Sequence, residues 1–263
     1  MDNKEISVAR VIAIANQKGG VGKTTTAVNL SASLAVAEKR TLLIDMDPQA
    51  NASSGLNIDK INVISTVYSV LLGEKKALEV ICRGELEYLD VLPSNTDLAG
   101  AEVELIDAEN REQQLRLALE GIKDEYEYII IDCPPSLGLL TINALTAADS
   151  VLVPLQCEFY AMEGLGQLMH TIRLVQHELN RDLKLEGILL TMFDGRNNIC
   201  HQVCQEIRQH FGDKVFNVVV PRNVRLSEAP SFGKPALLYD IASRGAQSYM
   251  ELAEEMVTGG THG

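Results

Sequence analysis

The 263-residue sequence contains no apolar run that approaches the roughly 18–20 residues a membrane-spanning helix needs. Its N-terminus, MDNKEISVAR, carries mixed charge and leads into an apolar stretch too short for a secretory signal. Because neither a membrane segment nor an export signal is recognisable, we expect the protein to be cytoplasmic.

Cysteine is scarce and irregularly spaced. The sequence has five cysteines, an odd number that argues against a disulfide framework. Cys200 and Cys204, with His201 between them, resemble half of a metal site, but no second ligand pair completes a tetrahedral set. The alternative, which we favour, is that Cys200 and Cys204 lie one turn apart on a helix.

Basic residues are also few. The chain has 23 Lys and Arg against 36 Asp and Glu, and a net charge of −13 by itself disfavours a nucleic-acid partner. The deficit is uneven, however, with 14 basic and 26 acidic residues in 1–180, 8 and 6 in 181–234, and 1 and 4 in the remainder. Any surface for a polyanion is therefore expected within 181–234, although an excess of two charges is small enough to arise by chance.

Internal repeats, low-complexity tracts and interdomain linkers are absent as well, and apolar strand-like segments alternate with helical ones. Such strands indicate a mostly parallel sheet with helices on both faces. We therefore predict an α/β, doubly wound single domain over 1–255, a disordered tail over 256–263, and ligand sites beyond the C-terminal ends of the strands. The predicted strands are 8–17, 40–48, 88–94, 126–136, 148–156, 185–193 and 214–223, and the predicted helices are 23–38, 108–122, 163–180 and 198–211.

A glycine-rich stretch, NQKGGVGKTTT, follows the first predicted strand. Gly19, Gly20 and Gly22 let backbone N–H groups close around phosphate oxygens, and the following helix N-terminus adds a favourable dipole. Lys23 is expected at the β- and γ-phosphates of a nucleotide, and the Thr24 hydroxyl is expected at Mg²⁺. The stretch therefore predicts a phosphate-binding loop rather than a simple turn.

This loop departs from the usual pattern at its first position. A standard phosphate loop begins with glycine where Gln17 stands here, and a second lysine, Lys18, follows. Since Lys23 already serves the loop's own nucleotide, Lys18 is most useful if it reaches the nucleotide of a neighbouring subunit, as an arginine finger does. The stretch thus predicts a dimer whose assembly requires ATP.

Carboxylates follow two further predicted strands. Asp132 ends the run IIID, where a metal-holding carboxylate is expected to bind the Mg²⁺ shell through water. Asp45 and Asp47 end LLIDMD, and they would face the same side if that strand continued. A carboxylate near the γ-phosphate can orient the attacking water. Taken alone, Asp45 and Asp47 could equally form a solvated strand end.

KGGVGKTTT with its extra lysine, DMDPQAN and IIIDCPPSLG together resemble the ParA/MinD group of deviant Walker A P-loop ATPases. PLQCEFYAMEGL, LTMFDGR and VPRNVRLSEAPSFGKPALLYDIASRGAQSY are similar to the chromosomal ParA (Soj-like) branch. The resemblance covers nearly the whole chain. It implies a Mg²⁺-dependent ATP hydrolase that drives DNA segregation.

The resemblance also implies roles for individual residues. Lys18 matches the lysine that reaches the partner's nucleotide, Gly19 a position of close subunit approach, and Asp47 the aspartate needed for hydrolysis. Asp45 matches part of the switch and possible metal environment. The implied catalytic residues are Lys18, Lys23, Asp47 and Asp132. The implied ATP contacts are Lys18, Gly19, Gly20, Val21, Gly22, Lys23, Thr24 and Thr25, with Pro221 and Asn223 at the adenine.

Arg196, Arg222 and Arg225 match or neighbour arginines implicated in sequence-independent binding of double-stranded DNA by the dimer. A dimer doubles any basic patch, and phosphate contact depends on local rather than net charge. The alternative for each arginine is a surface salt bridge worth ~0–1 kcal/mol. The further implied partner is a ParB/Spo0J-like centromere-binding protein, and the implied location is the bacterial nucleoid.

Other functions remain open at this point. A MinD-like positioning ATPase on a membrane surface would need a basic amphipathic C-terminal helix, whereas SYMELAEEMVTGGTHG is acidic. We therefore expect no membrane partner. An iron–sulfur ATPase of the nitrogenase-reductase type would need a cysteine partner for Cys133, and none is evident. A binding module without turnover conflicts with the number of catalytic residue types gathered at one loop.

Overall fold

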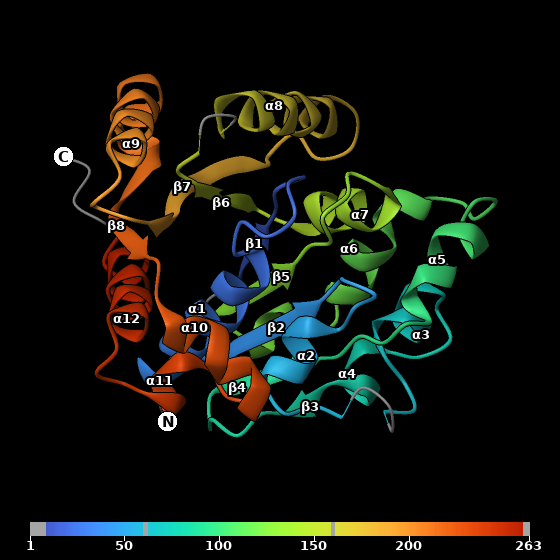
Figure 1. Cartoon of the computed structure of the whole chain (residues 1–263). Coiled ribbons are helices and arrows are strands. Elements are labelled where there is room, and N and C mark those ends of the chain that lie inside the picture. Colours follow the sequence, from blue (N-terminus) through green and yellow to red (C-terminus); the bar gives the residue numbers. More distant parts are fainter. Residues whose placement is uncertain (1–8, 60–62, 159–160, 260–263) are drawn as a thin grey trace, which may run out of the picture.

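The computed structural model describes residues 9–59, 63–158 and 161–259. Its eight strands within this part of the chain form one sheet, and helices cover both faces of that sheet (Figure 1). The strands are β1 (Arg10–Ile14), β2 (Thr41–Asp45), β3 (Cys82–Arg83), β4 (Leu89–Leu92), β5 (Tyr128–Asp132), β6 (Ser150–Gln156), β7 (Lys184–Phe193) and β8 (Val215–Pro221). The longer helices are α1 (Lys23–Val36), α7 (Leu139–Ala147), α8 (Ala161–Glu178), α9 (Asn198–Phe211) and α12 (Arg244–Val257).

Shorter helices fill the connections. They are α2 (Asn51–Gly55), α3 (Val67–Leu71), α4 (Ala77–Val80), α5 (Leu98–Glu104), α6 (Gln114–Leu119), α10 (Val224–Glu228) and α11 (Ala236–Tyr239), with 3₁₀ turns η1 (Arg111–Gln113), η2 (Lys123–Glu125), η3 (Gly212–Lys214) and η4 (Ala229–Phe232). Among the described residues, no helix is long and apolar enough to cross a membrane.

The strand order is β3-β4-β2-β5-β1-β6-β7-β8, and every pair is parallel except β3 with β4. The chain leaves β1, crosses to β2, and later inserts β5 between them before it continues outward through β6. Strand order therefore reverses around β1, the position at which doubly wound sheets bind ligands. The predicted α/β, doubly wound, mostly parallel fold is confirmed.

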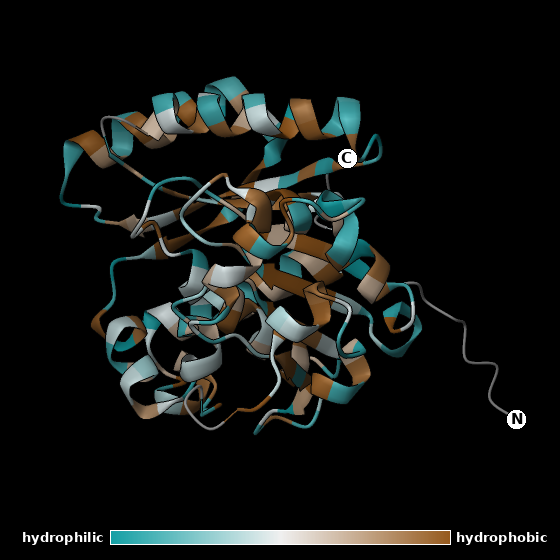
Figure 2. Ribbon diagram, turned by 90° about the vertical axis from the view of Figure 1, so that its right-hand side faces the viewer, coloured by the Kyte–Doolittle hydropathy of each residue, from teal (hydrophilic) through white to brown (hydrophobic). Residues whose placement is uncertain are grey.

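Side chains alternate between two cores along each central strand. On β1, Val11 and Ala13 join the core under α6 to α9, whereas Ile12 and Ile14 join the core under α1 and α12. This period of two follows from the pleat of a strand. Figure 2 shows the result as hydrophobic strands in the interior and helices whose outward faces are hydrophilic.

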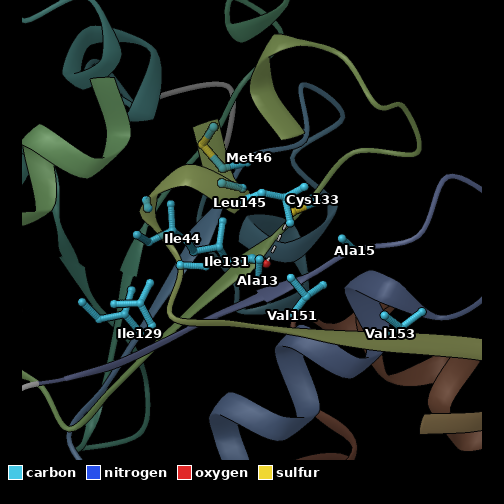
Figure 3. Close-up of a cluster of buried hydrophobic side chains, with 14 of the residues drawn as sticks. Ala13, Ala15, Ile44, Met46, Ile129, Ile131, Cys133, Leu145, Val151 and Val153 are labelled. Atoms are coloured by element: carbon cyan, nitrogen blue, oxygen red, sulfur yellow. Dashed lines mark hydrogen bonds between the residues drawn. The ribbon is translucent and has the colours of Figure 1, made fainter. Parts of the chain in front are cut away.

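Cys133 belongs to the first of these cores. Its side chain lies among Ala13, Ile131 and Val151 (Figure 3), it is 1% exposed, and its thiol donates a long hydrogen bond of 3.9 Å to the Ile131 carbonyl. Burial raises the pKa of this thiol. Cys133 is thus a core residue and does not face a surface where a second subunit could share a cluster.

Several predicted boundaries need correction. The helix predicted over 108–122 is only the six-residue α6 preceded by η1, because Asn110 adopts a left-handed conformation with φ of 54° before it. Helix α1 ends at Val36 rather than at residue 38, since Glu38 is also left-handed with φ of 59°. The predictions also missed the antiparallel β3 and several helices, namely α2, α3, α4, α5, α7, α10, α11 and α12.

The C-terminal boundary lies later than predicted. Helix α12 continues to Val257, and Met256 is 3% exposed in the core, so these residues belong to the domain. Residues 260–263 of the predicted tail lie outside the described residues. The predicted helix over 198–211 is confirmed as α9, and it carries both Cys200 and Cys204.

The outer edge of β8 is covered by side chains from two helices. The Glu255 carboxylate of α12 accepts from the backbone N–H groups of Asn217 and Val218, at 3.0 and 3.2 Å. Arg208 of α9 donates to the Phe216 carbonyl at 3.1 Å. Backbone groups that an edge strand would leave open are thereby occupied.

Candidate nucleotide site at the carboxyl edge of the sheet

The C-terminal ends of β1, β5 and β2 lie in register. Ile14 of β1 pairs with Asp132 of β5, and Asp132 pairs in turn with Asp45 of β2. Partners in adjacent parallel strands point to the same face, so the two carboxylates are neighbours. The sequence placed both residues at strand ends, and the register brings them together beside the loop that follows β1.

The glycine-rich loop leads directly into α1. Gly20 and Gly22 have φ of 75° and 91°, which is the left-handed region that glycine adopts without strain. Helix α1 begins at Lys23, and its first turn contains no acidic residue. The first N–H groups of a helix have no acceptor within the helix, so the loop offers donors and a positive dipole end to a phosphate.

Two buried polar side chains that the sequence analysis missed hold this loop. Asn16 is 3% exposed, donates to the Pro154 carbonyl at 2.8 Å, and accepts from the Lys18 N–H at 3.0 Å. The Thr191 hydroxyl, on β7, donates to the Val21 carbonyl at 2.8 Å. Asn16 could have been suspected as a buried amide at a strand end, but nothing local in the sequence points to Thr191.

Lys23 lies inside the loop with 7% of its surface exposed. Its ammonium donates to the Lys18 carbonyl at 3.0 Å and therefore reaches back across the loop. Burial lowers the pKa of Lys23, while Asp132, Cys133 and Asp47 act in the opposite direction. This arrangement holds a positive charge beside the acidic strand ends.

Asp132 is fully buried, and within the described residues neither carboxylate oxygen has a hydrogen-bond partner. Burial and then the neighbouring Asp45 raise its pKa well above the usual value, and the Lys23 ammonium and the nearby Thr24 hydroxyl, which does not meet hydrogen-bond geometry, oppose that shift only in part. An ionised carboxylate without donors is costly in such a site. Mg²⁺ with its bound water would supply both charge and donors, so Asp132 and Thr24 fit the predicted metal shell.

Asp45 is also fully buried, but its carboxylate is already occupied. One oxygen accepts from the Ser53 N–H and hydroxyl at 2.8 and 2.7 Å, and the other accepts from the Asp47 N–H at 3.1 Å. Burial raises the pKa of Asp45 to about 6 despite these hydrogen bonds. The bonds give Asp45 a structural role in shaping the turn, and its predicted role at the metal stays a prediction.

Asp47 lies beyond the strand, because β2 ends at Asp45. Its carboxylate accepts from the Gln49 N–H at 2.9 Å, and 8% of the residue is exposed. The next residue but two, Ala50, is left-handed with φ of 53° and caps α2. Asp47 and Asp45 are therefore joined through a turn, and the condition of a continuing strand is not met.

A pocket of about 410 Å³ adjoins the loop. Its lining includes Gly22 from the loop, Thr25 from the first turn of α1, Pro221 at the end of β8, and Arg222 and Asn223 directly after that strand. The Asn223 side-chain oxygen accepts from the Arg225 N–H at 2.9 Å and caps α10, which leaves its amide group as a donor. The structure thus brings the two predicted adenine contacts to the phosphate loop.

Lys18 and Gly19 lie on the exposed side of the loop. The Lys18 ammonium forms an ion pair with Glu158, and both side chains are about half exposed, at 43% and 45%. A Cβ added to Gly19 would find no neighbour closer than Pro135 at 4.0 Å. Within the described chain, the loop places Lys18 away from its own strand-end carboxylates and gives no steric reason for glycine at position 19.

The three predicted DNA-binding arginines lie near the ends of β7 and β8, but two of them pair with carboxylates. Arg196 forms a two-bond pair with Asp194, at 2.9 and 2.8 Å. Arg225 contacts Glu228 at 2.7 Å and Asp240 at 3.1 Å.

Arg222 is exposed and forms no ion pair within the described residues. The hydrogen bonds from Arg196, with a smaller contribution from Arg222, lower the pKa of Asp194 to about 2. Two of the three arginines are therefore paired with carboxylates, the alternative that the sequence left open, whereas Arg222 is not.

Comparison with known proteins gives consistent matches. Residues 9–185 match a family model described as an AAA domain. The chain is 63% identical over 251 residues to the chromosome partitioning protein ParA of Myxococcus xanthus, covering 95% of this chain and 89% of that protein. It is 58% identical over 253 residues to the sporulation initiation inhibitor protein Soj of Bacillus subtilis, covering 96% of this chain and 100% of that protein.

A solved structure extends the match to three dimensions. A Mycobacterium smegmatis chain, described as cobyrinic acid a,c-diamide synthase with bound ATP analog and magnesium, is 40% identical. The alignment covers 95% of each chain with a TM-score of 0.84.

We predict that Asp132→Asn stabilises the protein in the absence of nucleotide and Mg²⁺. A carboxyl whose pKa is raised by folding keeps its proton longer than in the unfolded chain, so wild-type stability falls as pH rises from about 4 toward the raised pKa. Asparagine removes this penalty, and the free energy of unfolding at pH 8 should rise by on the order of 1–3 kcal/mol. Urea unfolding at pH 5 and pH 8 measures the difference.

Asp45→Asn provides the matched control. Because the pKa of Asp45 is raised to about 6, neutralising it also relieves a penalty at pH 8, but the new amide nitrogen would face donors that now bond to the carboxylate, so the gain should be smaller than that of Asp132→Asn. An Asp132→Asn protein that is less stable than wild type at pH 8 would contradict the interpretation of Asp132 as an uncompensated charge.

Proposed function

The chain belongs to the ParA/Soj family of chromosome-partitioning ATPases, and we propose that it is a DNA-segregation ATPase that acts as an ATP-dependent dimer. In this proposal the dimer binds double-stranded DNA without sequence preference. A ParB/Spo0J-like partner stimulates hydrolysis of ATP to ADP and phosphate, and release from the nucleoid follows.

ATP with Mg²⁺ is the nucleotide that the site accommodates best. The loop from Gly19 to Thr25 offers N–H donors and Lys23 to the phosphates, and the adjoining pocket with Pro221 and Asn223 has room for the base. The bound ATP analog and magnesium in the M. smegmatis chain support this choice. Magnesium would supply electrostatic stabilisation of the phosphates, held on this chain by Thr24 and by Asp132 through water.

Hydrolysis needs a positioned water, and Asp47 is the residue proposed to orient it. Its carboxylate follows the strand whose end pairs with that of Asp132, so it lies close to the γ-phosphate end of the loop. Its carboxylate accepts from the Gln49 N–H within a tight turn. An ionised carboxylate has further lone pairs, so Asp47 could accept from a water while it keeps this bond.

The ATP-dependent dimer is proposed because Lys18, beside Gly19, is exposed on the surface of the loop. Lys18 pairs with Glu158 at the surface, a contact worth ~0–1 kcal/mol that another anion can replace. Within this chain a Cβ added to Gly19 would find no atom closer than Pro135 at 4.0 Å, so the glycine there fits the approach of a further group, which we propose is the second chain. Both features fit a partner subunit that brings its phosphates to Lys18.

DNA binding is proposed for the surface around Arg222. This residue lies in the segment that lines the nucleotide pocket, so closure of the pocket around ATP would also position it. Phosphates would compete with Asp194, Glu228 and Asp240 for the neighbouring arginines. Because these pairs are exposed, the exchange would cost little and would depend strongly on salt.

The proposal as a whole is tested by DNA co-sedimentation with ATP, ADP or no nucleotide, with the oligomeric state measured on the same samples. We predict retention on DNA only with ATP, and its loss in the double variant Arg222→Glu with Arg225→Glu, which should still dimerise. Charge reversal at both positions should weaken binding by at least tenfold at physiological salt. Arg181→Glu, at the opposite end of the sheet, is the matched control and should bind normally.

Unchanged DNA binding in the double variant would exclude this surface. DNA binding without nucleotide by the wild type would exclude the ATP-dependent dimer as the binding form.

We predict that Asp47→Ala still binds ATP, dimerises and binds DNA, but hydrolyses ATP at least 100-fold more slowly, because the water loses its orienting carboxylate. Steady-state phosphate release with DNA and the partner protein measures the rate. Asp47→Asn keeps an acceptor for the Gln49 N–H but removes the negative charge, so it distinguishes a catalytic role of the carboxylate from a structural role in the turn. If Asp47→Asn hydrolyses at the wild-type rate while Asp47→Ala does not, the residue acts only through the turn.

We predict that Gly19→Val folds and binds ATP as a monomer but does not dimerise. A Cβ at this position would have no close neighbour within the chain, so we expect the added side chain to obstruct the approach of a second chain; ATP binding is measured on the same variant because Gly19 belongs to the phosphate loop. Light scattering in an Asp47→Ala background, which retains ATP, measures the dimer fraction. Gly121→Val, where a Cβ also meets no neighbour within 4 Å, is the matched control. A Gly19→Val protein that dimerises normally would show that this face is not the interface.

A further inference from the structure

Two thiols from distant parts of the chain face each other outside the nucleotide site. Cys157 directly follows β6, and Cys204 lies in the second turn of α9. Their sulfur atoms are 3.2 Å apart although 47 positions separate them in the sequence. The contact therefore depends on the fold and could not be found from spacing, which drew attention only to Cys200 and Cys204.

The surrounding packing explains why the two sulfurs meet. Cys157 is 2% exposed and belongs to the core on the α9 side of the sheet, together with Cys200, Val203 and Ile207 of α9. Cys204 lies one turn after Cys200 at the border of this core and is partly exposed. The apolar face of α9 thus packs near the end of β6, and Cys204 lies at the edge of this contact.

A third thiol, that of Cys200, lies near this pair but points toward the backbone. The Cys200 thiol donates to the Cys157 backbone carbonyl at 3.4 Å, so it is aimed at the main chain and not at the Cys157 sulfur. Among the described residues, His, Cys, Asp and Glu side chains form no cluster of three that could hold a metal ion. Thiol chemistry between two residues therefore explains the arrangement better than metal binding.

We propose that Cys157 and Cys204 form a reversible disulfide, which makes this dithiol an oxidative modification site. Hydrogen peroxide is the two-electron oxidant. The Cys204 thiolate attacks one peroxide oxygen, the O–O bond breaks, and the departing hydroxide takes up the thiol proton and leaves as water. The resulting sulfenic acid is attacked by Cys157, whose proton leaves with the sulfenic oxygen as a second water. Overall, two thiols and one peroxide give one disulfide and two waters.

The surroundings of the two thiols indicate that Cys204 reacts with the oxidant first and Cys157 second. Cys204 is the more accessible thiol, and Arg208, one turn further along α9, partly offsets the effect of burial on its pKa. Burial raises the pKa of Cys157 further, so this residue is the resolving thiol and not the first to react. The pair is consequently slow to oxidise and remains reduced until an oxidant accumulates.

The disulfide would join two functional segments. Cys157 precedes Glu158, the surface partner of Lys18. Helix α9 begins just after the turn that contains Arg196. Closing the sulfur–sulfur distance from 3.2 Å to a bond requires an approach of about 1 Å, which side-chain rotation and a small helix shift can supply. Oxidation would thus link α9 covalently to the end of β6, beside the residue that pairs with Lys18.

The experiment treats the reduced full-length protein with hydrogen peroxide, blocks remaining thiols with iodoacetamide, and analyses tryptic peptides without reduction. We expect a peptide pair linked through Cys157 and Cys204, identified by fragment ions because each peptide carries a second cysteine. Blocked thiols should fall from five to three per chain. Cys200→Ser should retain the link, whereas Cys204→Ser, on the same helix, should lose it at least tenfold.

Hydrogen–deuterium exchange on the oxidised protein tells whether the bond forms in the native fold. Amides of α9 should exchange more slowly after oxidation and regain the original rate after reduction with dithiothreitol. A linked peptide without this protection would mean that the bond forms in an unfolded fraction, and the proposal would fail. It would also fail if oxidation gave only sulfinic acids, intermolecular links, or a bond between Cys157 and Cys200.

Discussion

A buried carboxylate that nothing in the described chain satisfies determines the rest of this site. Parallel register places Asp132 between the phosphate loop and Asp45, and neither of its oxygens accepts a hydrogen bond from a described residue. Asp45, by contrast, is supplied with three donors by the turn that follows it. One acidic strand end is thus supplied with donors by the protein, and the other fits the proposed hydrated cation. In that proposal, metal and nucleotide would provide the charge and the donors that Asp132 does not receive from the described chain.

The segment from Pro221 to Asn223 belongs to both of the proposed binding surfaces. It lines the pocket beside the phosphate loop, and it carries Arg222, which forms no ion pair within the described residues. If the proposal holds, nucleotide and DNA would contact neighbouring residues at the end of β8. Binding at one surface could then affect the other through this short segment.

Local patterns predicted the fold class, the phosphate loop and the acidic strand ends, because strand periodicity and glycine spacing are properties of adjacent residues. Contacts between distant residues were not predictable in this way. Ser53 reaches Asp45 across 8 positions, and Thr191 reaches Val21 across 170. The helix over 108–122 was wrong since a left-handed Asn110 overrides an amphipathic pattern. Salt bridges were an open alternative for the arginines, but the sequence could not show which carboxylates pair with Arg196 and Arg225, because those partners are set by the fold.

The acidic C-terminal helix α12 also covers part of the outer edge of the sheet. Glu255 occupies the open N–H groups of β8, and Arg208 occupies a carbonyl, so the last strand of the sheet offers little to another chain. Free N–H and C=O groups on an edge strand can pair with a strand of another molecule. The contact that the last turns of α12 make with β8 therefore removes some of the groups through which two copies of this chain could join edge to edge.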